Sequence, residues 1–143
     1  MELNKINSLV ELFFKKYEEI SKSSDQQFLK WLKDSEKKFL TWKEVEIKVK
    51  ALSDYLKTGL SKGDRCVLLS ENRPEWLIAD LAIMNAGGVT VPLFTTYSEK
   101  DYEYIIKDCE PKICIVSNDI QLQKIKKFVS KKINILSIDN ISN

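Results

Sequence analysis

The sequence has no histidine among its 143 residues, and it holds only four glycines, three prolines and three cysteines. Without an imidazole the chain has no Ser-His-Asp or Cys-His nucleophile system, no histidine general base and no histidine-ligated zinc site. The three cysteines are Cys66, Cys109 and Cys114, and two of them lie inside apolar runs. This placement is typical of cysteines that act as small hydrophobic residues in a protein of a reducing compartment. The acidic residues are scattered without metal-ligand spacing, so the sequence predicts no metal site.

A strong charge of one sign is lacking as well. The net charge is +2, and only Arg65 and Arg73 among the 23 basic residues are arginines, which argues against nucleic acid as a partner. The longest apolar stretch, residues 77–84, is interrupted by Asp80 and is too short to span a membrane. The N-terminus has no apolar secretory segment. Composition therefore predicts a folded, cytoplasmic protein without a transmembrane segment.

The first part of the chain predicts three elements before any buried strand. Apolar residues recur at helical spacing in residues 1–20, which predicts an amphipathic helix. We expect its apolar stripe to pack on the domain, and the alternative is peripheral membrane association through this helix. Residues 28–60 predict a short hairpin, with a turn at residues 34–36, followed by a helix. Thr41 and Glu44 form a capping box at the start of that helix, and Gly59 is expected to end it in a left-handed conformation.

From residue 62 the pattern changes to β-α repeats that run to residue 143. Apolar strands are expected to begin at Arg65, Val89, Lys112 and Ile133, with one helix in each interval, at residues 75–85, after Ser98, and at residues 119–131. Parallel neighbours need such helical crossovers, and strands without alternation are buried on both faces. The predicted fold class is α/β, with a partial doubly wound parallel sheet from about residue 65.

The sites expected in such a sheet lie beyond the carboxyl ends of its strands. The first end carries Glu71, Asn72 and Arg73, and Arg73 beside a helix N-terminus suits an anion. The alternative for Arg73 is an ion pair with Glu71 or Glu75. The second end carries hydroxyls and an aromatic ring, on Thr95, Thr96 and Tyr97. Its alternative is a hydroxyl-stabilised turn that leads into the Ser98 helix cap.

The positions of the glycines weigh against a nucleotide site in this chain. A phosphate cradle needs glycine at a strand-to-helix turn, where backbone amides approach the phosphate. Gly59 and Gly63 precede the first buried strand, and residues 87–88 join a helix to a strand, at the opposite end of the sheet. The sequence therefore predicts no cofactor bound by this chain alone.

The stretch from Phe39 to Ser117 carries several motifs in a characteristic order. They are LTW-x-EV, GD-R, ENRPEW, Ala-Gly-Gly before VPL, and a tyrosine-rich helix after Ser98. With these motifs the chain resembles the N-terminal region of long-chain acyl-CoA synthetases, which are ligases of the AMP-binding, adenylate-forming superfamily. The resemblance implies that residues 1–143 are the N-terminal part of an AMP-binding domain.

For the full-length enzymes, the resemblance implies a two-step fatty acid–CoA ligase of fatty acid metabolism. A fatty acid attacks the α-phosphate of ATP, with Mg²⁺ balancing charge, and CoA then displaces AMP from the acyl-adenylate. The family's phosphate loop, Mg²⁺-binding Glu, ribose-binding Asp and catalytic Lys have no counterpart in residues 1–143. We therefore expect a fragment that ends before the phosphate-binding loop, contains no catalytic residue and is inactive alone.

Two rival functions remain at this stage. The chain is a non-catalytic interaction module or split-enzyme subunit that pairs with the missing downstream ligase portion, or it is a stand-alone domain for a small anion at Arg73. An unfinished parallel sheet offers an exposed edge for the first of these.

Overall fold

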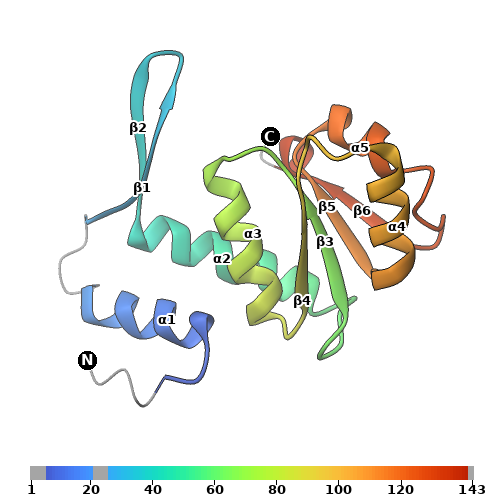
Figure 1. The fold of residues 1–143 in the computed structure, drawn as a ribbon. Helices are drawn as coiled ribbons and strands as arrows, with labels where there is room; N and C mark the ends of the chain where they lie inside the picture. Colours follow the sequence, from blue (N-terminus) through green and yellow to red (C-terminus); the bar gives the residue numbers. More distant parts are fainter. Residues whose placement is uncertain (1–5, 21–25, 142–143) are drawn as a thin grey trace.

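Four short apolar segments form one parallel sheet at the centre of the fold, as the sequence predicts (Figure 1). The computed structural model describes residues 6–20 and 26–141. The strands are β3 (Arg65–Leu69), β4 (Val89–Leu93), β5 (Ile113–Val116) and β6 (Asn134–Ser137). They are hydrogen-bonded in the order β4-β3-β5-β6, and every neighbouring pair is parallel. The α/β class and the parallel sheet are therefore confirmed.

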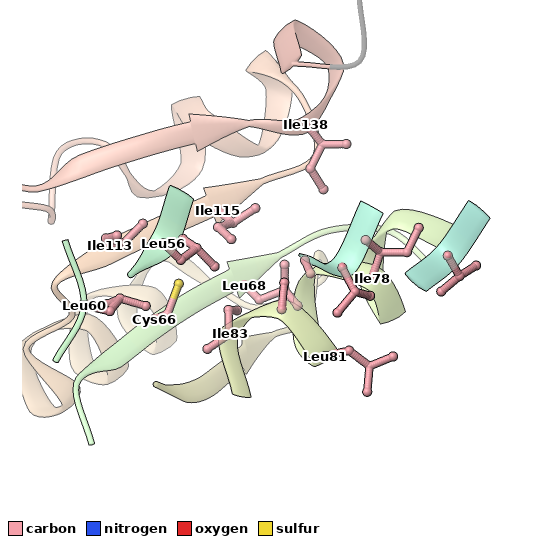
Figure 2. Close-up of a cluster of buried hydrophobic side chains, with 14 of the residues drawn as sticks. Leu56, Leu60, Cys66, Leu68, Ile78, Leu81, Ile83, Ile113, Ile115 and Ile138 are labelled. Carbon is pink, nitrogen blue, oxygen red and sulfur yellow. The ribbon is translucent and has the colours of Figure 1, made fainter. Parts of the chain in front are cut away.

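Helices cover both faces of this sheet. Successive residues of a strand point to opposite faces, so each strand contributes side chains to both helical layers. Cys66 and Leu68 of β3 pack with α2 (Trp42–Leu56) and α3 (Pro74–Asn85) in one buried cluster. Figure 2 shows this cluster, with Leu68 among side chains of α3 and of β5. Val67 and Leu69 pack on the other side with α4 (Glu99–Cys109) and α5 (Asp119–Ile125). Burial on both faces explains why these strands do not alternate with polar residues.

Local side-chain chemistry sets where three of the helices begin. The predicted capping box of α2 is present, with the Thr41 hydroxyl accepting from the Glu44 amide at 3.2 Å. Ser98 and Asp101 form a second capping box at the start of α4. Asn118 caps α5 by accepting from the Gln121 amide at 3.1 Å. Each cap satisfies amide groups that a helix start leaves without an intrahelical partner.

The N-terminal part lies beside α2 and α3 and consists of helix α1 (Leu9–Ile20) and an antiparallel hairpin. The hairpin strands β1 (Gln27–Lys33) and β2 (Glu36–Thr41) confirm the predicted hairpin. Asp34 and Ser35 both have positive φ at its turn, as the type I′ form of a two-residue hairpin turn requires. Its base is held by stacked rings of Phe28 and Trp42, whose centroids are 3.9 Å apart, while its tip projects away from the sheet (Figure 1).

Two predicted helix boundaries, the start of α1 and the end of α5, are wrong. Helix α1 begins only at Leu9, because the Ser8 hydroxyl accepts from the Glu11 amide and starts the helix there. Residues 1–5 of the predicted helix lie outside the described residues. Helix α5 ends at Ile125 instead of residue 131, since the Phe128 amide bonds to the Ile125 carbonyl three residues back and tightens the turn.

The predictions for Gly59 and the last strand also need correction. Helix α2 ends at Leu56, and Gly59 does not have positive φ; the left-handed glycine after a helix is Gly87, with φ +86°. Strand β6 ends at Ser137, and residues 138–141 form helix α6 (Ile138–Ile141). The side chain of Ile138 is buried in the core. Among the helices of the described residues, none combines the length and the apolar character needed to cross a lipid bilayer.

Candidate functional site

The carboxyl ends of the strands gather at one edge of the sheet, which we call the carboxyl edge. From β3 the chain goes first to β4 on one side and then to β5 on the other. The order therefore reverses between β3 and β5, at the position where open α/β sheets bind their ligands. The residues that follow these two strands, Ser70–Arg73 and Ser117–Asn118, flank this position.

Glu71 connects the loop after β3 to helix α5. Its carboxylate Oε1 accepts from Gln121 Nε2 at 2.6 Å and from Asn118 Nδ2 at 3.4 Å. Partial burial acts to raise the pKa of Glu71. Hydrogen bonds that the carboxylate accepts from the side-chain amides of Gln121 and Asn118 oppose this effect, and the pKa lies below its ordinary value. Glu71 is therefore an anion at neutral pH, held at the point where the strand order reverses.

Arg73 is paired within the fold. Its Nε donates to Glu75 Oε2 and its terminal NH1 donates to Asp139 Oδ1, both at 2.8 Å. These bonds, with Glu75 as the larger contributor, raise the pKa of the Arg73 guanidinium. Of the two acids that the sequence offered as partners, Glu75 is the one bound, while Glu71 pairs with amides instead. The ion-pair alternative for Arg73 is thus favoured, and its second partner, Asp139, ties helix α6 to the loop after β3.

The loop after β4 is fixed by contacts from two helices. The carbonyl of Thr95 accepts from Lys124 Nζ of α5 at 2.7 Å. The carbonyl of Phe94 accepts from the buried Tyr102 hydroxyl at 2.8 Å, and the Tyr97 ring packs edge-on against Phe94. Thr96 is exposed. The turn interpretation fits this loop, since the Tyr97 amide also bonds back to the Phe94 carbonyl and the loop runs into the Ser98 cap.

Of the predicted site residues, Glu71 and Arg73 have the defined polar partners given above, whereas Asn72 is exposed on the same loop. Sequence reasoning missed Gln121, Lys124 and Asp139, which bind the loops from α5 and α6. Gln121 is only 4% exposed although it stands in a polar segment of the sequence. The Asn118 cap was the available signal, because it fixes the start of α5 and so places Gln121 one turn later over the carboxyl edge.

The cysteines take no part in this edge. Cys66 and Cys114 are buried on opposite faces of the sheet. Burial raises the pKa of each thiol to about 12. Neither thiol is a nucleophile at neutral pH, because the reactive form is the thiolate.

The residues present at this edge do not fit a triphosphate with its Mg²⁺. Glu71 is anionic, and within the described part of the chain Gln121 Oε1 is a buried acceptor that makes no hydrogen bond. Phosphate oxygens are also acceptors, so both groups repel them. The guanidinium of Arg73 already binds two carboxylates. In residues 6–20 and 26–141, no group of three His, Cys, Asp or Glu side chains is placed to hold a metal ion.

Comparisons with known proteins are consistent with this scaffold. The model of the AMP-binding enzyme family matches residues 17–142. A long-chain-fatty-acid–CoA ligase, ACSBG2, of Xenopus laevis is 36% identical over 105 residues, 73% of this chain. Fatty acyl-CoA synthetase A of Dictyostelium discoideum is 36% identical over 98 residues, 64% of this chain. The chain spans only 13% and 15% of the lengths of these two proteins.

Solved structures share the fold over nearly the whole chain. The fatty acyl-adenylate ligase of L. pneumophila, in complex with acyl adenylate and pyrophosphate, superposes with a TM-score of 0.78 at 21% identity. That match covers 96% of this chain and 24% of the ligase. VinN superposes with a TM-score of 0.78 at 19% identity, covering 95% of this chain and 34% of VinN. The arrangement of helices and strands described above thus also occurs as one part of larger proteins.

Proposed function

The chain belongs to the AMP-binding enzyme family, and on this premise we propose that it forms the N-terminal α/β scaffold of a ligase that activates long-chain fatty acids. The observation that carries the proposal is the 36% identity over 105 residues to a long-chain-fatty-acid–CoA ligase. In this reaction a fatty acid and ATP give an acyl-adenylate, and CoA takes over the acyl group. Fatty acid, ATP, Mg²⁺ and CoA are then substrates and cofactors of the complete enzyme.

Within that enzyme we assign residues 1–143 a structural part. The carboxyl edge presents an anionic Glu71 and a paired Arg73, so it does not itself hold the triphosphate. Its loops are nevertheless fixed by contacts between distant segments, such as Arg73 with Asp139 and Lys124 with Thr95. A rigid edge of this kind suits the positioning of neighbouring elements that carry the chemistry. We therefore propose that the chain is inactive by itself.

The proposed activity is testable in cells. Extracts of cells that lack the gene are expected to form long-chain acyl-CoA from fatty acid, ATP and CoA more slowly than matched wild-type extracts. Reintroduction of the complete gene should restore the rate, while thioester formation from acetate should be the same in all extracts. Equal rates of long-chain acyl-CoA formation with and without the gene would contradict the assignment to fatty acid activation.

A second function is favoured by one specific feature, the outer edge of β6. In the described part of the chain this strand pairs on one side only, with β5, and ends the sheet. An open strand edge accepts another strand through its free backbone groups. The alternative is therefore a non-catalytic interaction module or split-enzyme subunit whose partner is a separate ligase portion. Co-purification of such a portion with the chain would favour this alternative, and a monodisperse monomer in cell extracts would count against it.

A further inference from the structure

The β1–β2 hairpin exposes two large apolar side chains, Leu32 and Phe39. Leu32 is 71% exposed and Phe39 is 51% exposed. The hairpin projects away from the body of the molecule (Figure 1). A two-stranded ribbon at this position has two faces, and the side chains on each face follow from its register.

Register places Leu32 and Phe39 on one face together with two lysines. Lys30 lies directly opposite Phe39, and Leu32 lies directly opposite Lys37. Directly opposite residues share a face, and so do residues two apart on one strand. These four residues (Lys30, Leu32, Lys37 and Phe39) are therefore one surface, which we call the hairpin face. Leu32 and Phe39 are diagonal neighbours on it, a spacing within reach of an aromatic and a long aliphatic side chain.

The charge around the hairpin face is positive. Lys30 and Lys37 are exposed on the face itself, and Lys33 is exposed at the end of β1. Glu36, one of the two acids near the turn, forms an ion pair with Lys38. Long lysine side chains can bury their methylene stems beside apolar groups while the ammonium groups stay at a polar boundary. The hairpin face thus offers two apolar side chains between two cations.

We propose that the hairpin face docks on the surface of a lipid bilayer that carries anionic headgroups. Leu32 and Phe39 enter the boundary between headgroups and acyl chains, and the ammonium groups of Lys30 and Lys37 pair with lipid phosphates and carboxylates. A boundary of this kind matches both the apolar and the cationic parts of the surface. Such contact is peripheral, involves only a few residues and is reversible.

Another protein strand or a second copy of the chain fits this surface less well. Exposed lysines on a two-stranded ribbon disfavour edge-to-edge pairing, as they do on the sheet edges of natural proteins. Two apolar side chains also bury far less area than a specific protein interface needs. Binding to a bilayer has no such minimum area, because each apolar or cationic residue adds its own contribution to the free energy of binding.

The experiment is co-sedimentation of the 143-residue chain with phospholipid vesicles. We expect binding to vesicles of phosphatidylcholine with phosphatidylserine, and weaker binding to phosphatidylcholine alone. High salt should reduce the binding, since it screens the lysines. The double variant Leu32→Ser/Phe39→Ser should lower the partition coefficient at least about tenfold, because both apolar contacts are lost. The charge variant Lys30→Glu/Lys37→Glu should bind both kinds of vesicle equally weakly.

A matched control is Tyr104→Ser/Ile120→Ser, which removes two side chains of α4 and α5 that are each 69% exposed and lie outside the hairpin. This variant should bind as the unchanged chain does. Failure of the unchanged chain to bind anionic vesicles would overturn the proposal. Equal loss in the control variant, full binding by Leu32→Ser/Phe39→Ser, or sedimentation without vesicles through self-association would overturn it too. A failure of fatty acid activation in the extract experiment would leave this result unaffected.

Discussion

Replacement of Leu68 by alanine is expected to lower the free energy of unfolding by about 3 kcal/mol. Leu68 is fully buried in β3, an interior strand of the sheet. Its side chain packs in the cluster that joins the sheet to α2 and α3 (Figure 2). The neighbours come from regular elements on several sides, so they cannot collapse fully into the space that the shorter side chain leaves.

Urea denaturation followed by far-UV circular dichroism measures this loss. The matched control is Leu32→Ala, which makes the same change at a side chain that is 71% exposed. Its effect should stay within about 0.5 kcal/mol, as is usual for surface positions. Similar losses in the two variants would mean that β3 does not lie between two helical layers, and would contradict the fold.

The second large effect is expected from Gly88→Ala, at the junction of α3 and β4. A Cβ atom at residue 88 would lie 3.1 Å from Ile83 Cγ2, 3.2 Å from Leu60 Cδ1 and 3.3 Å from the Asp64 carbonyl oxygen. That carbonyl also accepts from the Val89 amide at 2.8 Å, so its displacement disturbs the start of the β3–β4 pairing. We expect a loss of about 2 kcal/mol, in the range of other overpacking substitutions.

Gly59→Ala is the matched control for this steric argument. A Cβ atom at residue 59 would meet only Ile113 Cδ1, at 3.3 Å, which is the flexible end of a side chain. The loss of stability should be clearly smaller than for Gly88→Ala in the same denaturation experiment. Equal losses would show that the close approach at residue 88 is not what requires glycine there. The comparison thus tests whether close packing explains the second glycine of the Ala-Gly-Gly segment, which is one of the motifs of the family resemblance.

The sheet was predictable from the sequence because each strand is a short apolar run, and each interval holds one helix. Burial on both faces leaves a continuous run of residues such as Cys66–Leu69, which are all buried. Capping residues gave the starts of α2 and α4, since a hydroxyl three residues before an acid has a specific local geometry. These signals are local, so one sequence suffices to read them.

The errors lie at the ends of elements, where the periodicity of apolar residues does not fix the boundary. Periodicity extends the helix after Asn118 to residue 131, whereas α5 ends at Ile125, where the Phe128 amide bonds back to the Ile125 carbonyl. The chain changes from strand to helix at Ile138, an apolar residue that continues the pattern of the strand and is buried in the core. A left-handed residue after a helix was expected at Gly59, yet such residues occur at Gly87 after α3 and at Glu110 after α4.

The candidate site was only partly predictable, because its contacts join segments that are distant in the sequence. The sequence placed Glu71 and Arg73 at the carboxyl end of a strand, and the sheet puts them beside the position where the strand order reverses. The partners of both residues come from elsewhere in the chain: Gln121 is 50 residues from Glu71, and Asp139 is 66 residues from Arg73. From the sequence alone, Glu71 and Arg73 are free to bind a ligand. The fold shows that Gln121 and Asp139 already bond to them.

The most direct test of the proposed role is calorimetric titration of the purified 143-residue chain with ATP and Mg²⁺. If the chain is a scaffold whose carboxyl edge does not grip a triphosphate, the titration shows no saturable heat and no magnesium dependence. Saturable, magnesium-dependent binding with a micromolar dissociation constant would contradict this account.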